Sequence, residues 1–282
     1  MTGTITLDNV ATTDHDGHNQ LGGSATYATL AAAEFAPVRL VGAVGYDARA
    51  ALTKALSGLP VDVTSVETSD LPNFWWRARY DPLSWETLEE TYGEGAYSVW
   101  HPTMSASAAS SPILFLGALR PDLQSEALDQ SRAELIGLDS RHAHFVQRHE
   151  LMSVLTRADL LFLNRSELGA LTGRDPTDWR EAAMALLGTG RLRAVVVKAG
   201  ALGAACVWLT GVVELPAEPV SRVVDPTGAG DALAGGFLGA CARAHRSDPA
   251  FFQTALGQGL ACAARAIASR GVSGLVAGPS SG

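Results

Sequence analysis

The chain has 282 residues, of which 47% are hydrophobic and 18% are charged, so it can build a large core and an intrinsically disordered protein is excluded. Its 29 acidic residues exceed its 21 basic residues, and the net charge of −8 leaves no basic stripe for nucleic-acid binding. The sequence shows neither an apolar run long enough to span a membrane nor a signal peptide, so we expect a cytoplasmic protein without a membrane partner.

Apolar runs alternate with helix-like stretches along the chain. The runs expected to form strands are Val38–Val44, Ile113–Gly117, Leu135–Leu138, Leu160–Leu163 and Ala194–Val197. The stretches expected to form helices are Ser24–Phe35, Asp47–Leu56, Asp122–Leu128, Ser166–Leu171 and Trp179–Leu187. Continuous hydrophobicity is typical of parallel strands that are covered by helices on both faces, so the sequence predicts a layered α/β fold.

Residues 71–101, called the flap below, depart from this alternation because eight of the chain's 19 aromatic residues gather there. The run Phe74–Tyr80 alternates aromatic residues with Arg77 and Arg79, which indicates a strand. One interpretation is an edge hairpin packed on the main sheet. The other, which we favour, is a lid over a site or a surface that pairs two subunits into a homodimer, because aromatic residues beside charges are typical of such surfaces.

The strongest motif is Asp225–Asp231 (DPTGAGD), between Val223–Val224, expected to end a strand, and an alanine- and glycine-rich run, expected to form a helix. Gly228 and Gly230 leave backbone N–H groups unobstructed where that helix begins. These N–H groups and the helix dipole together form an anion site. Asp231 then lies in the first helical turn beside the anion, where its carboxylate can accept a proton from an attacking hydroxyl.

This expected helix contains three glycines that lower its stability, namely Gly235, Gly236 and Gly239. Each destabilises a helix by about 1 kcal/mol relative to alanine. Their number indicates that another backbone or a ligand approaches this helix closely.

Three further motifs have ordinary structural explanations when each is taken alone. Asn164–Glu167 (NRSE) follows an expected strand and matches a helix capping box. Lys198–Gly203 (KAGALG) lies between two strand-like runs and matches a glycine-containing hairpin. Gly22 and Gly23 precede Ser24–Phe35 and match a tightly packed helix start.

In this order and spacing, the four motifs resemble the ribokinase, or pfkB, family of sugar and nucleoside kinases. DPTGAGDALAGGF resembles the C-terminal signature of that family, LGGSATYATLAAAEF resembles its di-glycine signature, and Gly3–Asp8 resembles its first strand. The resemblance spans about residues 3–275. It implies one domain over residues 1–282 with a ribokinase-like three-layer α/β/α fold, a central mostly parallel sheet and a small β lid that contains the flap.

The resemblance also implies roles for individual residues. Asp231 would be the catalytic base. The backbone amides of the anion hole would come from Gly228, Ala229 and Gly230. The acceptor pocket would be lined by Asp8, Gly22 and Gly23.

For the cofactors, the resemblance implies a second group of residues. The nucleotide would be bound by Asn164, Lys198, Gly200 and Gly203. Glu167 would bind Mg²⁺ through water, and Asp225 would bind a monovalent cation such as K⁺.

The implied activity is transfer of the γ-phosphoryl group of ATP, with Mg²⁺, to a hydroxyl, a primary CH₂OH group, of a sugar or sugar-like small molecule. A nucleoside kinase is the first alternative, because Phe74, Trp75 and Trp76 could stack on a base. A kinase of an unusual glycoside and a catalytically idle small-molecule binder are the others. The presence of Asp231, the glycine turn before it and Glu167 argues against an idle binder.

Three departures from the family pattern limit what the resemblance implies. Pro226 replaces the Thr or Ser that often follows the first Asp of the motif, which bears on activation by K⁺. Leu138–His142 (LDSRH) lacks the Asn of the DxNxR motif that many sugar kinases carry. The residues after Gly23 differ from the ribokinase pattern, so ribose specificity is not implied.

The histidines and cysteines suggest no metal site. His142, His144 and His149 lack a carboxylate or cysteine at ligand spacing, so we expect polar surface there. His15, His18 and Asn19 precede the di-glycine and are weaker candidates for substrate contact. The three cysteines lie far apart in apolar runs and are expected to be buried thiols, namely Cys206, Cys241 and Cys262.

Overall fold

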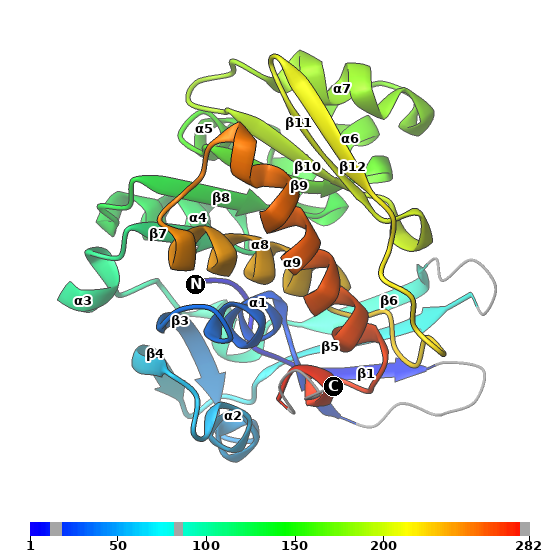
Figure 1. Cartoon of the computed structure of the whole chain (residues 1–282). Coiled ribbons are helices and arrows are strands. Elements are labelled where there is room, and N and C mark those ends of the chain that lie inside the picture. The colour runs from blue at the N-terminus through cyan, green and yellow to red at the C-terminus, as the bar shows by residue number, and fades with distance from the viewer. Residues whose placement is uncertain (12–18, 82–86, 277–282) are drawn as a thin grey trace.

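The computed structural model describes residues 1–11, 19–81 and 87–276, in which helices and strands alternate (Figure 1). The strands are β1 (Thr6–Ala11), β2 (Gln20–Gly22), β3 (Val38–Gly45), β4 (Val61–Ser69), β5 (Phe74–Tyr80), β6 (Thr87–Gly93), β7 (Ile113–Leu116), β8 (Leu135–Asp139), β9 (Leu160–Asn164), β10 (Ala194–Lys198), β11 (Ala204–Trp208) and β12 (Gly211–Leu215). The α-helices are α1 (Ser24–Ala33), α2 (Arg49–Leu56), α3 (Ala106–Ala109), α4 (Pro121–Gln130), α5 (Arg148–Leu155), α6 (Arg165–Thr172), α7 (Trp179–Leu186), α8 (Ala229–Ala244), α9 (Pro249–Ile267) and α10 (Ser273–Val276).

The main sheet has the strand order β12-β11-β10-β9-β8-β7. Strands β7 to β10 are parallel to one another, whereas β11 and β12 add an antiparallel edge. Thr2 forms parallel bridges to Val41 of β3 and to Leu116 of β7, which brings the parallel pair β3–β4 beside the main sheet. The expected mostly parallel sheet is confirmed.

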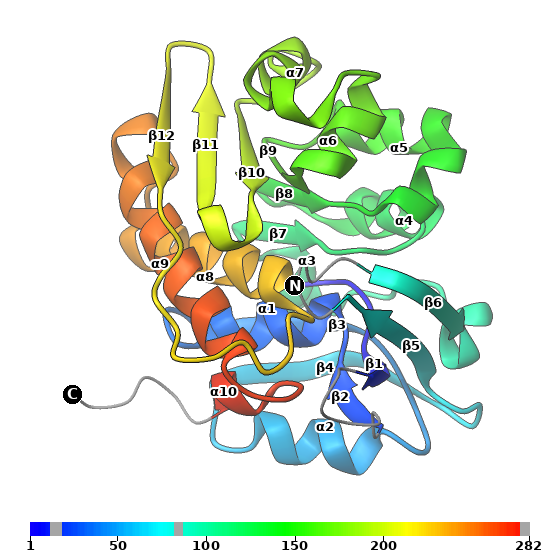
Figure 2. The same ribbon diagram turned by 90° about the vertical axis from the view of Figure 1, so that its right-hand side faces the viewer.

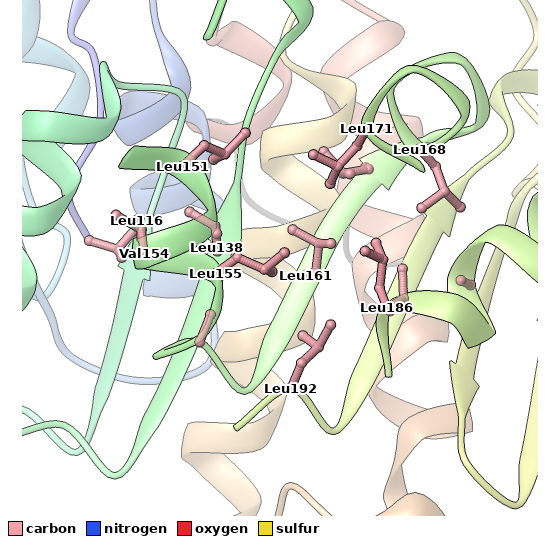
Figure 3. Packing of buried hydrophobic residues seen from close by; sticks show 14 of the residues in the cluster. Leu116, Leu138, Leu151, Val154, Leu155, Leu161, Leu168, Leu171, Leu186 and Leu192 are labelled. Atoms are coloured by element: carbon pink, nitrogen blue, oxygen red, sulfur yellow. The ribbon is translucent and has the colours of Figure 1, made fainter. Parts of the chain in front are cut away.

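Side chains on the central strands alternate between two hydrophobic layers. On β9, Leu161 and Leu163 pack with residues of α4 to α7, and Figure 3 shows the leucines of this layer. Leu160 and Phe162, which point the other way, pack with residues of α8 and α9. Figure 2 shows these two sets of helices on opposite sides of the strands. Burial on both faces explains why these strands are apolar without alternation.

Helix α8 packs closely on α1, and its glycines make this possible. A Cβ atom on Gly235 would lie 2.3 Å from the carbonyl oxygen of Ala28, and one on Gly239 would lie 3.0 Å from the Cα of Ala32. The expectation that another backbone approaches this helix is therefore confirmed.

A second sheet, called the small sheet below, has the order β2-β1-β5-β6. β1 pairs with β5 in parallel, so that Asp8 lies opposite Trp76. β5 and β6 come from the flap, and Trp85 of the flap lies outside the described residues. Two other flap residues, Tyr97 and Trp100, are buried in a hydrophobic cluster beside β3. The flap thus shares its sheet with the first strands of the chain.

The segment before α8 differs from expectation. Val223 and Val224 do not end a strand; the backbone N–H of Val224 instead donates a hydrogen bond to the carbonyl of Ile267 at the end of α9 (2.8 Å). The three cysteines are buried, as expected. In the part of the chain described here, no helix combines the length and the apolar character needed to cross a membrane.

Candidate active site

A cavity of about 430 Å³ lies between the small sheet and the carboxyl ends of the parallel strands. The sequence-predicted site residues that line it are Asp8, Gly23, Glu167, Lys198, Gly228 and Asp231. The remaining ones lie outside its lining, namely Gly22, Asn164, Gly200, Gly203, Asp225, Ala229 and Gly230. The motifs, which are far apart in the sequence, therefore converge on one space.

The N-terminus of α8 opens toward this cavity. Its N-cap is Gly228, which has a left-handed φ of 77° and provides no side-chain cap. A Cβ atom there would lie 2.3 Å from the ring of Tyr27 on α1, so only glycine fits. The uncapped N–H groups of the first turn, together with the helix dipole, make an anion site.

Asp231 lies in the first turn of α8, as expected, and is half-buried where it lines the cavity. Burial, together with the nearby carboxylates of Asp139, Glu167 and Asp8, raises the pKa of Asp231 to about 7, against the opposing effect of Lys198. The group is therefore poised to exchange a proton near neutral pH, which suits a general base.

Lys198 forms a partly buried ion pair that was not predicted from the sequence. It ends β10, and its Nζ donates to both carboxylate oxygens of Asp139 at the end of β8, at 2.9 and 3.2 Å. Burial disfavours the ammonium, but the carboxylates of Asp139 and its neighbours outweigh this and raise the pKa of Lys198. A Cβ atom on Gly230 would lie only 3.0 Å from this Nζ, so the positive charge is beside the N-terminus of α8.

The capping-box interpretation of Asn164 and Glu167 is confirmed. The Asn164 side chain accepts a hydrogen bond from the Glu167 N–H (2.7 Å), and the Glu167 carboxylate accepts one from the Asn164 N–H (2.8 Å). Glu167 also borders the cavity, so the cap holds its carboxylate there. Burial raises the pKa of Glu167.

The residues present suit a loosely held Mg²⁺ ion. Among the described residues, no three His, Cys, Asp or Glu side chains gather as a metal cage. Mg²⁺ commonly keeps several waters and binds through one or two carboxylates plus substrate phosphates. Glu167, with Asp139 nearby, meets that requirement.

Asp8 lies in the middle of β1 and also lines the cavity. Its carboxylate accepts a hydrogen bond from the Thr6 hydroxyl (2.6 Å), and burial raises its pKa to about 7. Gly22 packs directly against it, because a Cβ atom on Gly22 would lie 1.8 Å from Asp8 Oδ2. Gly22 therefore acts on the cavity through the position of Asp8.

Replacing Gly22 with alanine should displace the Asp8 carboxylate. We expect the KM for the acceptor to rise by about 10-fold or more, the cost of one lost charged hydrogen bond, while the KM for ATP stays within about twofold. Steady-state kinetics in both substrates would measure this. Gly257→Ala is the control, since neither Gly22 nor Gly257 has a positive φ and a Cβ added at Gly257 meets only Leu215 Cδ1, at an ordinary contact distance of 3.8 Å. An unchanged acceptor KM in Gly22→Ala would contradict the role given to Asp8.

Three other motif residues lie outside the cavity lining and shape loops beside it. Gly200 and Gly203 shape the hairpin between β10 and β11, with φ of 57° and 96°. Asp225 accepts hydrogen bonds from the N–H groups of Thr227 (2.9 Å) and Gly271 (3.4 Å), which fixes the loop before α8. A monovalent cation at Asp225 stays a prediction.

Aromatic residues of the small sheet form the opposite wall of the cavity, namely Phe74, Trp76, Tyr80 and Tyr92. Trp75, which neighbours them in the sequence, does not line the cavity; it lies under the Arg77 guanidinium (4.9 Å). The expectation that Trp75 faces the substrate is therefore not met.

Polar contacts join the small sheet and the end of the flap to the rim of the cavity. The Tyr80 hydroxyl lies 3.3 Å from the Thr227 hydroxyl in the loop before α8. The other contacts are the ion pairs Glu90–Arg141 (2.9 Å) and Glu94–Arg120 (3.3 Å). These contacts place the small sheet over the site.

The histidines divide into three groups. His142 and His149 are exposed, as expected, whereas His144 lines the cavity and is half-buried, which corrects its assignment to the surface. His15 and His18 lie outside the described residues. Asn19 is exposed and does not line the cavity.

Comparison with known proteins identifies the family. A model described as the pfkB family carbohydrate kinase matches residues 117–276. This chain belongs to the pfkB family. As a pfkB kinase, it is a phosphotransferase that acts on hydroxyl acceptors.

Several pfkB relatives are nucleoside or sugar kinases. The cytidine kinase of Thermococcus kodakarensis is 26% identical over 226 residues, which cover 71% of this chain and 80% of the relative. A Burkholderia thailandensis nucleoside kinase, solved with inosine, superposes with a TM-score of 0.77 at 21% identity. The match covers 96% of this chain and 91% of the nucleoside kinase chain. The ribokinase of Cryptococcus neoformans, solved with ADP, superposes with a TM-score of 0.78 at 20% identity. The match covers 98% of this chain and 95% of the ribokinase chain. These likenesses confirm the ribokinase-like fold.

Proposed function

We propose that the cavity is the site where the γ-phosphoryl group of ATP is transferred to a primary hydroxyl of an uncharged sugar or nucleoside. The observation that carries this proposal is the position of Asp231. Its carboxylate lies in the first turn of α8, beside uncapped N–H groups and the Lys198 ammonium, in the same cavity as Asp8. A proton acceptor next to an anion site is the arrangement that phosphorylation of an alcohol requires.

In the proposed reaction, Asp8 holds the acceptor through its hydroxyl groups. The Asp231 carboxylate takes the proton of the attacking hydroxyl as its oxygen forms the new bond to phosphorus, and the bond between that phosphorus and ADP breaks. The N–H groups of Gly228, Ala229 and Gly230, with Lys198, neutralise charge on the transferring group. Mg²⁺ bound through Glu167 would neutralise charge on the phosphates. Asn164, Gly200 and Gly203 would shape the nucleotide site around them.

A nucleoside is the second candidate for the acceptor class within this activity. Phe74, Trp76 and Tyr92 give the cavity an aromatic wall, and aromatic side chains suit contact with a base. The named relatives include a cytidine kinase and a nucleoside kinase.

A phosphorylation screen tests the activity. Purified protein, ATP, Mg²⁺ and K⁺ are incubated with sugars and nucleosides, and products are identified by mass spectrometry. A gain of one phosphoryl group on an acceptor supports the proposal, and omitting K⁺ tests the monovalent cation at Asp225. ATP binding without any phosphorylated acceptor would favour an unusual acceptor outside the panel, and the absence of ATP binding would favour an idle binder.

The rate should rise with pH through about 7. Asp231 must be ionised to accept a proton, and burial raises its pKa to about 7, as it does for Asp8. We therefore expect kcat/KM, measured below saturation in both substrates, to be low at pH 5.5, to rise with an inflection near pH 7 and to level off by pH 8.5. A flat profile between pH 5.5 and 8.5 would contradict the assignment of Asp231 as the base.

We propose that the enzyme is cytoplasmic. We also propose that the outer face of the small sheet is the interface of a homodimer. Trp75 and Arg77 lie on β5 and do not line the cavity, so they are available to a second copy. Light scattering at micromolar concentration would measure the mass. A monomer mass would contradict pairing through the flap.

A further inference from the structure

The end of β8 and the segment that follows it contribute more residues to the cavity lining than any other continuous segment of the described chain. Their lining residues are Asp139, Ser140, Arg141, Ala143, His144, Val146 and Gln147. The proposed reaction uses only Asp139, through its ion pair with Lys198. The rest of this segment therefore lines the cavity without a role in that reaction.

Two polar atoms of this segment are buried and have no hydrogen-bond partner among the described residues. They are Oγ of Ser140 and Nδ1 of His144. Ser140 as a whole is only 3% exposed. The other described atoms in this condition belong to residues that do not line the cavity. Because an unpaired buried polar group costs about 1–3 kcal/mol, Ser140 and His144 are placed where a bound molecule would complete their hydrogen bonds.

The charges around these two residues disfavour an anionic partner. The arginines that line this part of the cavity are already paired, Arg120 with Glu94 and Asp122, and Arg141 with Glu90. Burial, followed by the nearby Arg141, lowers the pKa of His144 to about 4, so its ring is neutral at pH 7. A neutral imidazole and a hydroxyl suit an uncharged group that both donates and accepts hydrogen bonds.

The opposite wall is aromatic. Trp76 lines the cavity together with Phe74 and Tyr92, which stack on each other with ring centroids 5.7 Å apart, and aromatic side chains suit contact with a flat ring. Tyr97 also lines the cavity, but its hydroxyl already has hydrogen-bond partners. It donates to the carbonyl of Gly3 and accepts from the backbone N–H groups of Ile5 and Ala43. The polar contacts to a ring therefore fall to the segment after β8.

We propose that Ser140 and His144 determine specificity by binding the polar edge of an uncharged, nucleobase-like ring of the acceptor. The preferred acceptors are then nucleosides, and phosphorylated or carboxylated sugars are rejected. This inference rests on the proposed phosphoryl transfer for its catalytic meaning, but the binding that it describes can be measured without turnover.

The test is a titration of tryptophan fluorescence, because Trp76 lines the cavity. Cytidine and inosine serve as full acceptors, and ribose serves as the acceptor without a ring base. His144→Ala and Ser140→Ala should each raise the Kd of a bound nucleoside by about 10-fold, which corresponds to one lost hydrogen bond, and leave the Kd of ribose unchanged. His144→Asn should stay within about threefold of the original protein, because its amide can place a polar atom where Nδ1 lies. The exposed His149, changed to Ala, is the matched control.

Several results would overturn the inference. They are the absence of cytidine and inosine binding to the unmodified protein, nucleoside affinities that survive both alanine variants, and an equal loss of ribose and nucleoside affinity. Tighter binding of ribose 5-phosphate than of nucleosides would also contradict it. If the expected binding pattern appears but no acceptor is phosphorylated, the proposed function fails and this inference stands; if ribose is phosphorylated and nucleosides do not bind, the reverse holds.

Discussion

Asp231→Asn should lower kcat by about 10²–10⁴-fold, the usual effect of losing a general base. The amide is close in size to the carboxylate and cannot accept the proton of the attacking hydroxyl. Because Asp231 lies within the first turn of α8 and the anion site is made of backbone N–H groups, binding of ATP should change little. Asp129→Asn, an exposed residue paired with Arg157, is the control and should retain full turnover.

The same variant should be more stable than the original protein at high pH. Burial and neighbouring carboxylates raise the pKa of Asp231 from its ordinary 3.8 to about 7 in the folded state, so the charged form destabilises the fold. This destabilisation is absent below pH 3.8, grows as the pH rises and is complete above about 7. We therefore expect a higher Tm for Asp231→Asn at pH 8, by about 3 °C or more, and a smaller gain at pH 5. Normal turnover, or a Tm gain independent of pH, would contradict the assignment.

Lys198→Met should damage both activity and stability. The Lys198 ammonium lies beside Gly230 at the start of α8, so the substitution removes a positive charge next to the proposed position of the transferring phosphoryl group. We therefore expect kcat to fall by about 10²–10³-fold. The substitution also leaves the Asp139 carboxylate buried without its cation, a change that typically costs about 3–5 kcal/mol. Thermal unfolding and kcat measured on the same preparation would show both effects.

A double variant separates the two effects of Lys198. Lys198→Met with Asp139→Asn removes both charges, so we expect most of the Tm to return while kcat stays low. Recovery of kcat to within about threefold of the original protein would show that Lys198 only neutralises Asp139.

The main sheet could be predicted because its strands are buried on both faces. Runs such as Leu160–Leu163 and Ala194–Val197 have no alternation, and the structure covers both of their faces with helices. The NRSE capping box and the start of α8 could be predicted for a similar reason, since each depends on hydrogen bonds between residues that are near in the sequence.

The Lys198–Asp139 pair could not be predicted in this way, because it depends on strand order. In the structure, β9 lies between β8 and β10, and the register places Lys198 opposite Asn164 and Asp139 opposite Phe162. The apolar runs of these strands are too alike to specify that order. An aspartate directly after the apolar run Leu135–Leu138 was the available signal, since carboxyl ends of parallel strands meet at one edge of a sheet.

The small sheet and the loop before α8 were unpredictable for different reasons. β1 and β5 pair although they are distant in the sequence, and neither strand shows which partner it takes. Val223–Val224 has the composition of a strand, but the loop uses the Val224 N–H to contact the end of α9. The inward orientation of His144 depends on tertiary packing, which residue type alone does not specify.

The close contact between α1 and α8 separates reaction geometry from substrate choice. Gly23, at the start of α1, and Gly228, at the start of α8, both line the cavity, and the packing of Gly235 on Ala28 holds the two helices at one fixed separation. In the proposed reaction, that separation sets where the acceptor hydroxyl meets phosphorus. Ser24 and Tyr27 of α1 also line the cavity, so redesign for new acceptors should keep the contact between the two helices and concentrate on the small sheet and the segment after β8.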